Sequence, residues 1–337
     1  MKRLLCLLTA VGAAFCTATH AWADDVEDFY RGRQIRFISG YPAGTDYDRW
    51  ARLFSRHWGR FIPGKPTFLV EYMPGAGQII AANYLYNIAE RQGATLLMFE
   101  RSLPNAALLG DPNIKVDPAK LTWIGSGEQT NRVCAAMNGV AVQKASDLFE
   151  HQLIVGGAGA GSGFSQTPTL LSRLLGMKFK LVEGYTGAEA AMLALERGEL
   201  EGLCNSLSGF RAVRPGWIEQ GKLIPLFTML REPEPGLNVP TIYEFTKTEE
   251  QREIIGVYMT SLEFGRPVVA PPDIPPERAN ALRRSFDAML ADPDFRAEAE
   301  KMNITLTLRK GEELQEIARH LKATPRHIVD KMQALMR

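Results

Sequence analysis

The residues of this chain best placed to do chemistry are glycines. Residues 156–163 read GGAGAGSG, directly after the apolar run 153–155 and shortly before a stretch, 169–175, with helical spacing. Glycine lets a backbone approach a ligand closely, and the first N–H groups of a helix have no partner within the helix. The stretch therefore predicts a cradle for an anion, built mostly from main-chain amides.

The known nucleotide-binding and catalytic patterns do not fit the sequence. A dinucleotide fingerprint fails because Ser162 or Phe164 stands where the third glycine is needed, and a Walker loop needs a lysine that the stretch lacks. The chain also has no G-x-S-x-G elbow and no H-E-x-x-H pair. We therefore expect a protein that is not an enzyme, with no cofactor and no metal site.

The first residues have the order of a secretory signal peptide. Lys2 and Arg3 precede an apolar run, residues 4–18, and a small-residue site ends at Ala23. Cleavage after Ala23 would remove residues 1–23 and leave a periplasmic chain. No later stretch approaches the roughly 20 apolar residues that a membrane helix needs.

The charge of the chain is nearly balanced. It carries 39 Lys and Arg against 38 Asp and Glu in 337 residues, a formal net charge of +1. Nucleic acids and anionic membranes attract strongly basic surfaces, so neither is expected as a partner. The length exceeds what one core comfortably fills, and two lobes are expected.

Two cysteines, Cys134 and Cys204, remain after the expected cleavage. In an oxidising compartment they could form a disulfide that joins two parts of one lobe, or the junction between the lobes. They could equally be two small buried apolar side chains. The sequence leaves both interpretations open.

Strands and helices alternate along the chain, with glycine-rich loops between them. The expected strands are at 34–39, 67–71, 95–99, 121–125, 132–137, 153–155, 178–182 and 223–228. The expected helices are at 47–58, 79–89, 146–150, 169–175, 187–197, 277–290 and 295–302. This alternation predicts an α/β protein with mostly parallel sheets covered by helices, in which ligands collect at the carboxyl ends of the strands.

The proline-rich segments 231–240 and 266–276 are predicted to be connections, because proline interrupts regular elements. The second of them is predicted to be the return between the lobes. On this reading lobe 1 comprises residues 24–126 and 258–337, and lobe 2 comprises residues 127–257.

Three loops, taken in order, resemble those of one protein family. Residues 44–48 (GTDYD), followed by Ala51 and Arg52, resemble a G-G-x-x-D-x-x-A-R loop; residues 74–77 resemble P-G-A-G; and residues 157–162 resemble G-x-G-x-G-S. These loops are typical of the tripartite tricarboxylate transporter solute-binding proteins, the Bug family. Shorter matches at 184–187, 198–202, 239–241 and 270–272 keep the family's order over essentially the whole mature chain.

The resemblance implies a two-lobed, type II-like periplasmic binding protein that closes on a small organic acid and passes it to the subunits of a membrane permease. It implies a ligand held mostly by loop amides and ordered waters, and we expect a monomer. One wall of the site would consist of Gly44, Thr45, Asp46, Tyr47, Asp48, Pro74, Gly75, Ala76 and Gly77. The other would consist of Gly159, Gly161, Ser162, Thr186 and Gly187. Arg101 and Asn205 are added because each follows a strand at its carboxyl end.

Some residues depart from the family pattern. Thr45 and Asp46 replace a second glycine and a small polar residue, Tyr72 replaces an asparagine, and Gln78 replaces a glycine. Asp46 would repel a carboxylate unless it turns away as a helix cap; otherwise the ligand carries a hydroxyl or amine from which Asp46 accepts.

Two alternatives remain open. The first is a binding protein that signals to a membrane kinase instead of feeding a permease. The second is an exported hydrolase or isomerase that uses Asp46 or Asp48 as a base, for which the sequence shows no partner acid.

Overall fold

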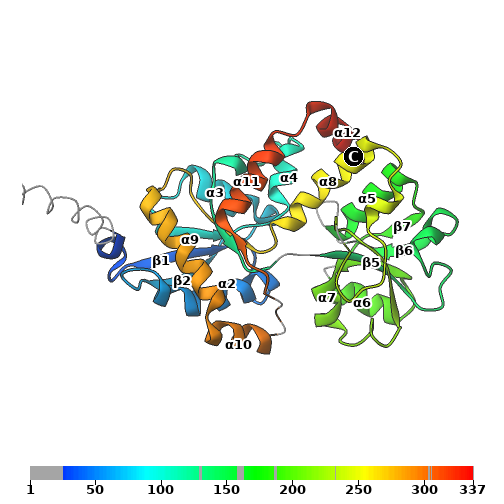
Figure 1. Ribbon diagram of the computed structural model, residues 1–337, viewed down its shortest axis with the longest axis horizontal. Coiled ribbons are helices and arrows are strands. Elements are labelled where there is room, and N and C mark those ends of the chain that lie inside the picture. Colours follow the sequence, from blue (N-terminus) through cyan, green and yellow to red (C-terminus); the bar gives the residue numbers. More distant parts are fainter. Residues whose placement is uncertain are drawn as a thin grey trace, which may run out of the picture.

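The protein consists of two helix-covered β-sheets that lie side by side (Figure 1). The computed structural model describes residues 26–128, 131–157, 163–185, 188–231, 233–302, 304 and 306–336. Among the helices of these ranges, none combines the length and the apolar character needed to cross a membrane. The two-sheet α/β architecture predicted from the sequence is confirmed.

The first sheet has six strands in the order β11-β4-β10-β3-β1-β2. Its strands are β1 (Gln34–Ser39), β2 (Thr67–Tyr72), β3 (Thr95–Met98), β4 (Thr122–Ser126), β10 (Pro267–Ala270) and β11 (Arg309–Lys310). β1 pairs in parallel with β2 and β3, whereas β10 is antiparallel to both β3 and β4. The carboxyl ends of β1, β2 and β3 therefore lie at the same edge of the sheet.

The prediction that residues 266–276 form only a connection is wrong, because Pro267–Ala270 is the central strand β10. Proline is tolerated at the first residue of a strand, where its missing N–H interrupts the ladder least. Val268 and Val269, which follow it, are fully buried. Burial of this short apolar run outweighs the proline signal on which the prediction depended.

Helices cover both faces of the first sheet. They are α2 (Asp46–His57), α3 (Ile79–Asn87), α4 (Leu103–Leu108), α9 (Pro276–Ala291), α10 (Pro293–Lys301) and α11 (Gly311–Lys322), with short 3-10 turns at Trp58–Phe61, Ala76–Gln78 and Pro118–Lys120. Aromatic side chains join α2 and the 3-10 turn that follows it to α9. The Phe54 and Phe286 ring centroids are 5.1 Å apart, and the indole N–H of Trp58 donates to Ser285 Oγ at 2.9 Å.

The second sheet has five strands in the order β7-β6-β8-β5-β9. Its strands are β5 (Arg132–Met137), β6 (Leu153–Gly156), β7 (Phe179–Val182), β8 (Gly202–Ser206) and β9 (Leu223–Thr228). Its helices are α5 (Gly163–Leu175), α6 (Ala188–Glu196), α7 (Leu207–Val213), α8 (Glu249–Glu263) and α12 (Arg326–Met336), and 3-10 turns occur at Ala145–Phe149 and Ile242–Phe245. β5 is antiparallel to its neighbours β8 and β9, so its first residue lies at the same edge as the ends of β8 and β9.

The C-terminal helix α12 packs with the second sheet's helices. Its Ile328 and Met332 belong to the same buried cluster as residues of α5 and α8, and α12 lies next to α8 in Figure 1. The predicted lobe 1, residues 24–126 and 258–337, includes this helix. The division into lobes stays a proposal, and the packing of α12 is the observation that bears on its C-terminal limit.

The two chain segments that connect the sheets contact each other closely. The chain passes from the first sheet to the second between β4 and β5, and it returns between α8 and β10. Ser126 Oγ accepts from the backbone N–H of Arg266 at 2.9 Å and donates to the carbonyl of Glu128 at 2.9 Å. The Arg266 side chain is largely buried, pairs with Asp46 and Glu128, and lies over the Tyr47 ring at 4.7 Å from its centroid.

Candidate anion-binding site

The loop after β1 is held in place by the buried carboxylate of Asp48, whose residue is 3% exposed. The carboxylate accepts from the backbone N–H of Gly44 at 2.7 Å, from Tyr72 OH at 2.6 Å and from Arg52 Nε at 2.8 Å. Tyr72, the departure from the family pattern, therefore joins the end of β2 to the loop after β1. The acceptor atoms of Asp48 are occupied by the protein's own donors.

These donors lower the pKa of Asp48. Burial alone would raise it, but the hydrogen bonds from Tyr72, Gly44 and Arg52 together outweigh burial. A catalytic base would need a raised pKa, so the geometry gives no support to an enzyme that uses Asp48 as its base.

Replacing Asp48 with asparagine is expected to lower the free energy of unfolding by about 1–3 kcal/mol at neutral pH. The NH₂ group of the asparagine would face N–H and O–H donors that now bond to a carboxylate oxygen, so at least one of those hydrogen bonds is lost. A lowered folded-state pKa gives stability that is present above the unfolded pKa and is lost as pH falls through the folded pKa. The difference between wild type and Asp48→Asn should therefore shrink in acid. Urea unfolding at pH 7 and below pH ~3.9, the ordinary Asp pKa, measures it. A difference that is unchanged in acid would contradict the account.

Asp46 does not cap α2. The N-cap is Thr45, whose Oγ1 accepts from the backbone N–H of Asp48 at 3.4 Å, so of the two alternatives left open for Asp46 the capping one is wrong. Asp46 instead forms an ion pair with Arg266. Its charge is thereby offset within the protein, which reduces the expected repulsion of a carboxylate ligand. The neighbouring Tyr47 is buried, its burial raises its pKa, and its OH accepts weakly from the backbone N–H of Arg101 at 3.5 Å.

The loop after β2 has an unusual backbone. Gly75, Ala76, Gly77 and Gln78 all have positive φ, at 142°, 46°, 62° and 73°. Two of them are not glycine, and such strain persists only where surrounding structure enforces it, often at ligand sites. The loop follows the exposed Pro74 and leads directly into α3.

In the sequence, Gln78 stands out only as a departure from the family pattern. Its side chain is fully buried, and neither its amide N nor its amide O has a hydrogen-bond partner within the described residues. It packs on Gly40 of the loop after β1, where a Cβ would lie 2.3 Å from Gln78 Cγ. A buried amide left without partners is costly, so Gln78 is an exception among the buried polar side chains of the described residues.

The glycine-rich stretch predicted as an anion cradle lies between β6 and α5 in the sequence. Gly159, Gly161, Ser162, Thr186 and Gly187 lie outside the described residues. The residues that flank them are described: Ser165, in the first turn of α5, donates through Oγ to Glu183 Oε2 at 3.0 Å.

Asn205 and Arg101 lie at strand ends, as their positions in the sequence predicted. Asn205 is the second-last residue of β8 and is 6% exposed; its Oδ1 accepts from the N–H of Ser206 at 2.7 Å, while its buried Nδ2 lacks a partner among the described residues. Arg101 follows β3 and Glu100, whose carboxylate accepts from Tyr41 OH at 2.9 Å. No contact that joins Asn205 to Arg101 is among the described ones.

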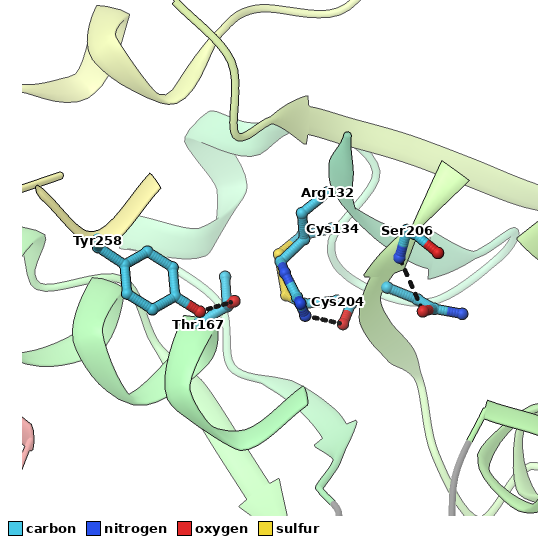
Figure 2. Close-up of a disulfide and its surroundings, with 7 residues drawn as sticks. Arg132, Cys134, Thr167, Cys204, Ser206 and Tyr258 are labelled. Carbon is cyan, nitrogen blue, oxygen red and sulfur yellow. Dashed lines mark hydrogen bonds between the residues drawn. A yellow bond between two sulfur atoms is a disulfide. The ribbon is translucent and has the colours of Figure 1, made fainter. Parts of the chain in front are cut away.

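The structure adds Arg132, which the sequence analysis did not select. It is the first residue of β5 and is 6% exposed, and its Nη1 donates to the carbonyl of Cys204 at 3.3 Å (Figure 2). Burial lowers its pKa, and Arg101 lowers it further, while Tyr258 and Glu100 raise it. The influence of Glu100 and Arg101 indicates that the loop after β3 lies within electrostatic range of β5.

A disulfide lies beneath Arg132. Cys134 and Cys204 are directly opposite each other on β5 and β8, and their sulfur atoms are bonded (Figure 2). Beside them, the hydroxyls of Thr167 and Tyr258 share a hydrogen bond of 2.7 Å. Of the two interpretations that the sequence left open, the structure shows the covalent one.

A groove of about 1470 Å³ is lined by residues from both halves of the molecule. Its lining includes Glu128, Ser208, Arg211, Arg296 and Thr307. Of the predicted loop residues that the structure describes, those at 44–48 and 74–77 do not line it. The groove and the described loops after β1 and β2 are therefore separate features of the surface.

Comparison with known proteins identifies the fold. No family model and no curated protein matches the sequence. A TctC solute-binding protein from Polaromonas, solved without ligand, is 20% identical with a TM-score of 0.68 over 90% of this chain and 99% of that one. The periplasmic binding protein BugD is 19% identical with a TM-score of 0.63, over 91% and 98%. MatC from Rhodopseudomonas palustris, solved with bound malate, is 19% identical with a TM-score of 0.62, over 90% and 99%.

The chain therefore has the two-lobed fold of the TctC and Bug periplasmic solute-binding proteins along most of its length. The expectation drawn from the order of the glycine-rich loops is confirmed for the fold. At sequence identities of 19–20% these neighbours show the fold of the chain, whereas its function depends on the residues of the site.

Proposed function

We propose that this protein is a periplasmic solute-binding protein of the tripartite tricarboxylate transporter type. It captures a small organic acid between its lobes and delivers the acid to the subunits of a membrane permease. The observation that carries the proposal is the position of the loops of the family pattern: those after β1 and β2 follow parallel neighbouring strands and lead into α2 and α3, in a chain with the fold of TctC.

The chemistry of these loops suits an anion. A helix N-terminus favours negative charge by about 0.3–1 kcal/mol when exposed and up to ~2 when partly buried. Each hydrogen bond to a charged group adds roughly 1.5–3 kcal/mol. Three or four such contacts, reduced by the cost of ordering and desolvation, are compatible with the roughly −8 kcal/mol of a micromolar complex.

The comparisons and the ion pairs around the loops support the same proposal. MatC was solved with malate, a small dicarboxylate, so a carboxylate is the ligand class proposed for this chain. Asp46, the residue that could have repelled it, is paired with Arg266. In this proposal lobe 1 contains the loops after β1, β2 and β3, and lobe 2 contains residues 159–162 and 186–187.

We expect the mature protein to bind at least one of succinate, malate, glutarate and adipate with a dissociation constant near or below the micromolar range. Isothermal titration calorimetry against this panel measures it, and mass spectrometry of the ligand released from freshly purified protein extends the panel to the natural compound. The corresponding diamides, which have the same shape without charge, are the control. Wild-type protein that binds no carboxylate tighter than millimolar would reject the proposal.

A further inference from the structure

Arg132 is a buried cation that has no anionic partner among the described residues. Its residue is 6% exposed, its Nε has no hydrogen-bond partner, and no ion pair joins it to an acidic side chain in the described parts of the chain. Arginine is almost never buried in this way unless it is paired. Burial lowers the pKa of Arg132, which is the signature of a charge that its surroundings do not offset.

The direction of the guanidinium is fixed. Arg132 and Cys134 are two residues apart on β5 and so lie on the same face of the strand, next to the disulfide with Cys204. Nη1 is held by the carbonyl of Cys204 at 3.3 Å (Figure 2). The remaining edge, formed by Nε and Nη2, is the edge with which arginine binds a carboxylate through two parallel hydrogen bonds.

Nη2 lies against the first residue of α5. A Cβ added to Gly163 would be 2.1 Å from Nη2 and 2.5 Å from Cζ, so the guanidinium occupies the space that a side chain would take there. α5 is 13 residues long, and its first N–H groups point away from the helix at this end. A buried cation and a helix N-terminus, both attractive to an anion, thus converge on one point.

The charged groups near this point do not form an ion pair with Arg132 among the described contacts. Glu183 interacts at Ser165, two residues farther into α5, and it is not among the groups that shift the pKa of Arg132. Arg101 lowers that pKa and Glu100 raises it, so these two neighbours act in opposite directions. The positive charge of Arg132 is therefore not cancelled by the acidic groups that influence it.

We propose that Arg132 and the first turn of α5 form a carboxylate subsite in which the ligand's charge is met by an ion pair, in addition to the main-chain amides. This inference rests on the proposed function, and it names Arg132 as the residue that makes the protein prefer a negatively charged ligand. It explains why a cation is buried at the start of β5: the bound carboxylate supplies the missing partner. It also means that the unpaired charge lowers the free energy of unfolding of the ligand-free protein, while the same charge strengthens ligand binding.

The test compares wild type with Arg132→Met and Arg132→Lys, titrated calorimetrically with succinate, malate and adipate. Loss of a bidentate, charge-assisted contact is expected to weaken the tightest of them roughly 10- to 100-fold in Arg132→Met. Arg132→Lys keeps the positive charge but cannot form two parallel hydrogen bonds to one carboxylate. Its affinity should therefore lie between those of wild type and Arg132→Met. The matched control is Arg214→Met, which removes an arginine of the same half that already has a partner, Glu196, at 2.8 Å; its affinity should equal that of wild type.

A second readout separates a ligand contact from a structural role. Removing an unpaired buried charge should leave the melting temperature of ligand-free Arg132→Met unchanged or higher, whereas a structural arginine would lower it. Gly163→Ala, whose methyl group displaces the guanidinium, should weaken binding in the same direction as Arg132→Met.

The possible results are distinct. If wild type binds a probe and Arg132→Met binds it equally well, the inference is overturned and the proposed function stands. If wild type binds none of the probes, both fail. If Arg132→Met does not fold, the inference is decided with Arg132→Lys. A carboxylate affinity equal to that of wild type overturns the inference. A weaker affinity with an unchanged melting temperature supports it.

Discussion

Gly265→Ala is expected to lower the free energy of unfolding by about 2–5 kcal/mol. Gly265 has φ of 63°, and a Cβ there would lie 1.5 Å from the carbonyl O of Glu128 and 2.6 Å from its carbonyl C. A left-handed backbone costs a residue with a side chain roughly 1–2 kcal/mol, and forced overpacking adds about 1–3 kcal/mol. The two backbone segments cannot easily move apart to make room for the methyl group, because Ser126 Oγ is hydrogen-bonded to both of them. Urea unfolding followed by circular dichroism measures the loss.

Gly221→Ala is the matched control for this substitution. Gly221 has nearly the same backbone conformation, with φ of 66°, but nothing lies within 4 Å of its added Cβ. Its substitution should therefore cost only the backbone part, about 1–2 kcal/mol. If both variants lose the same amount, the close contact between the connecting segments does not contribute to stability.

Gly265 lies in one of the two segments that join the halves of the molecule, and it contacts Glu128 in the other segment. Arg266, the next residue, carries a guanidinium that Glu128 approaches at 3.6 Å from the other connecting segment. Burial lowers the pKa of Arg266, but Glu128 and Asp46 outweigh burial and raise it. The connecting segments are thus tied by a charged contact as well as by the backbone approach at Gly265. Glu128 in turn accepts from Ser208 of α7 at 3.0 Å, which extends the contact to the second half.

Local sequence patterns predict most of the elements that hold the loops. Residues 34–39 and 132–137 were expected as strands and match β1 and β5, because alternating and β-branched residues report on a strand directly. β10 was missed because its proline is a strong local signal, whereas the burial that makes it a strand depends on neighbours distant in sequence. The helix expected at 146–150 is only a 3-10 turn, Ala145–Phe149.

The candidate site was less accessible to sequence reasoning. Asp48 was predicted to line the ligand site, and that role stays a prediction; its partner Tyr72 is 24 residues away, so the hydrogen bonds that occupy its carboxylate could not be foreseen. Arg132 gives no signal of its own, since an arginine at the start of a strand is usually exposed. Its significance depends on burial beneath Gly163, which follows from the way α5 packs on the second sheet. Gln78 is intermediate: its departure from the family pattern marked it, and only the structure shows that its amide is buried.

The disulfide illustrates the same difference and leads to the second large effect. The two cysteines are separated by 70 residues, and only the antiparallel pairing of β5 with β8 brings them face to face. A cross-link over a loop of this length restricts the unfolded chain and is expected to contribute about 4 kcal/mol. The double substitution Cys134→Ala/Cys204→Ala should lower the free energy of unfolding by that amount. Urea unfolding of the mature protein, with and without reductant, measures it.

Reductant supplies the internal control for this prediction. It should shift wild type to the midpoint of the double variant and leave the variant itself unchanged. Denatured, unreduced wild type should show no free thiol. Free thiols in that sample, or a wild-type midpoint that reductant does not move, would show that the bond does not form in solution.

The effect of the disulfide on binding should be much smaller than its effect on stability. The bond acts mainly on the unfolded chain, and in the folded protein the β5–β8 ladder still presents the Cys204 carbonyl to Arg132. The folded double variant should therefore keep a carboxylate affinity within a few-fold of wild type, where Arg132→Met loses roughly 10- to 100-fold. Calorimetry well below the lowered melting temperature tests this. Equal losses in the two variants would mean that the bond itself orients the guanidinium, because the strand pairing alone would then be too loose to hold it.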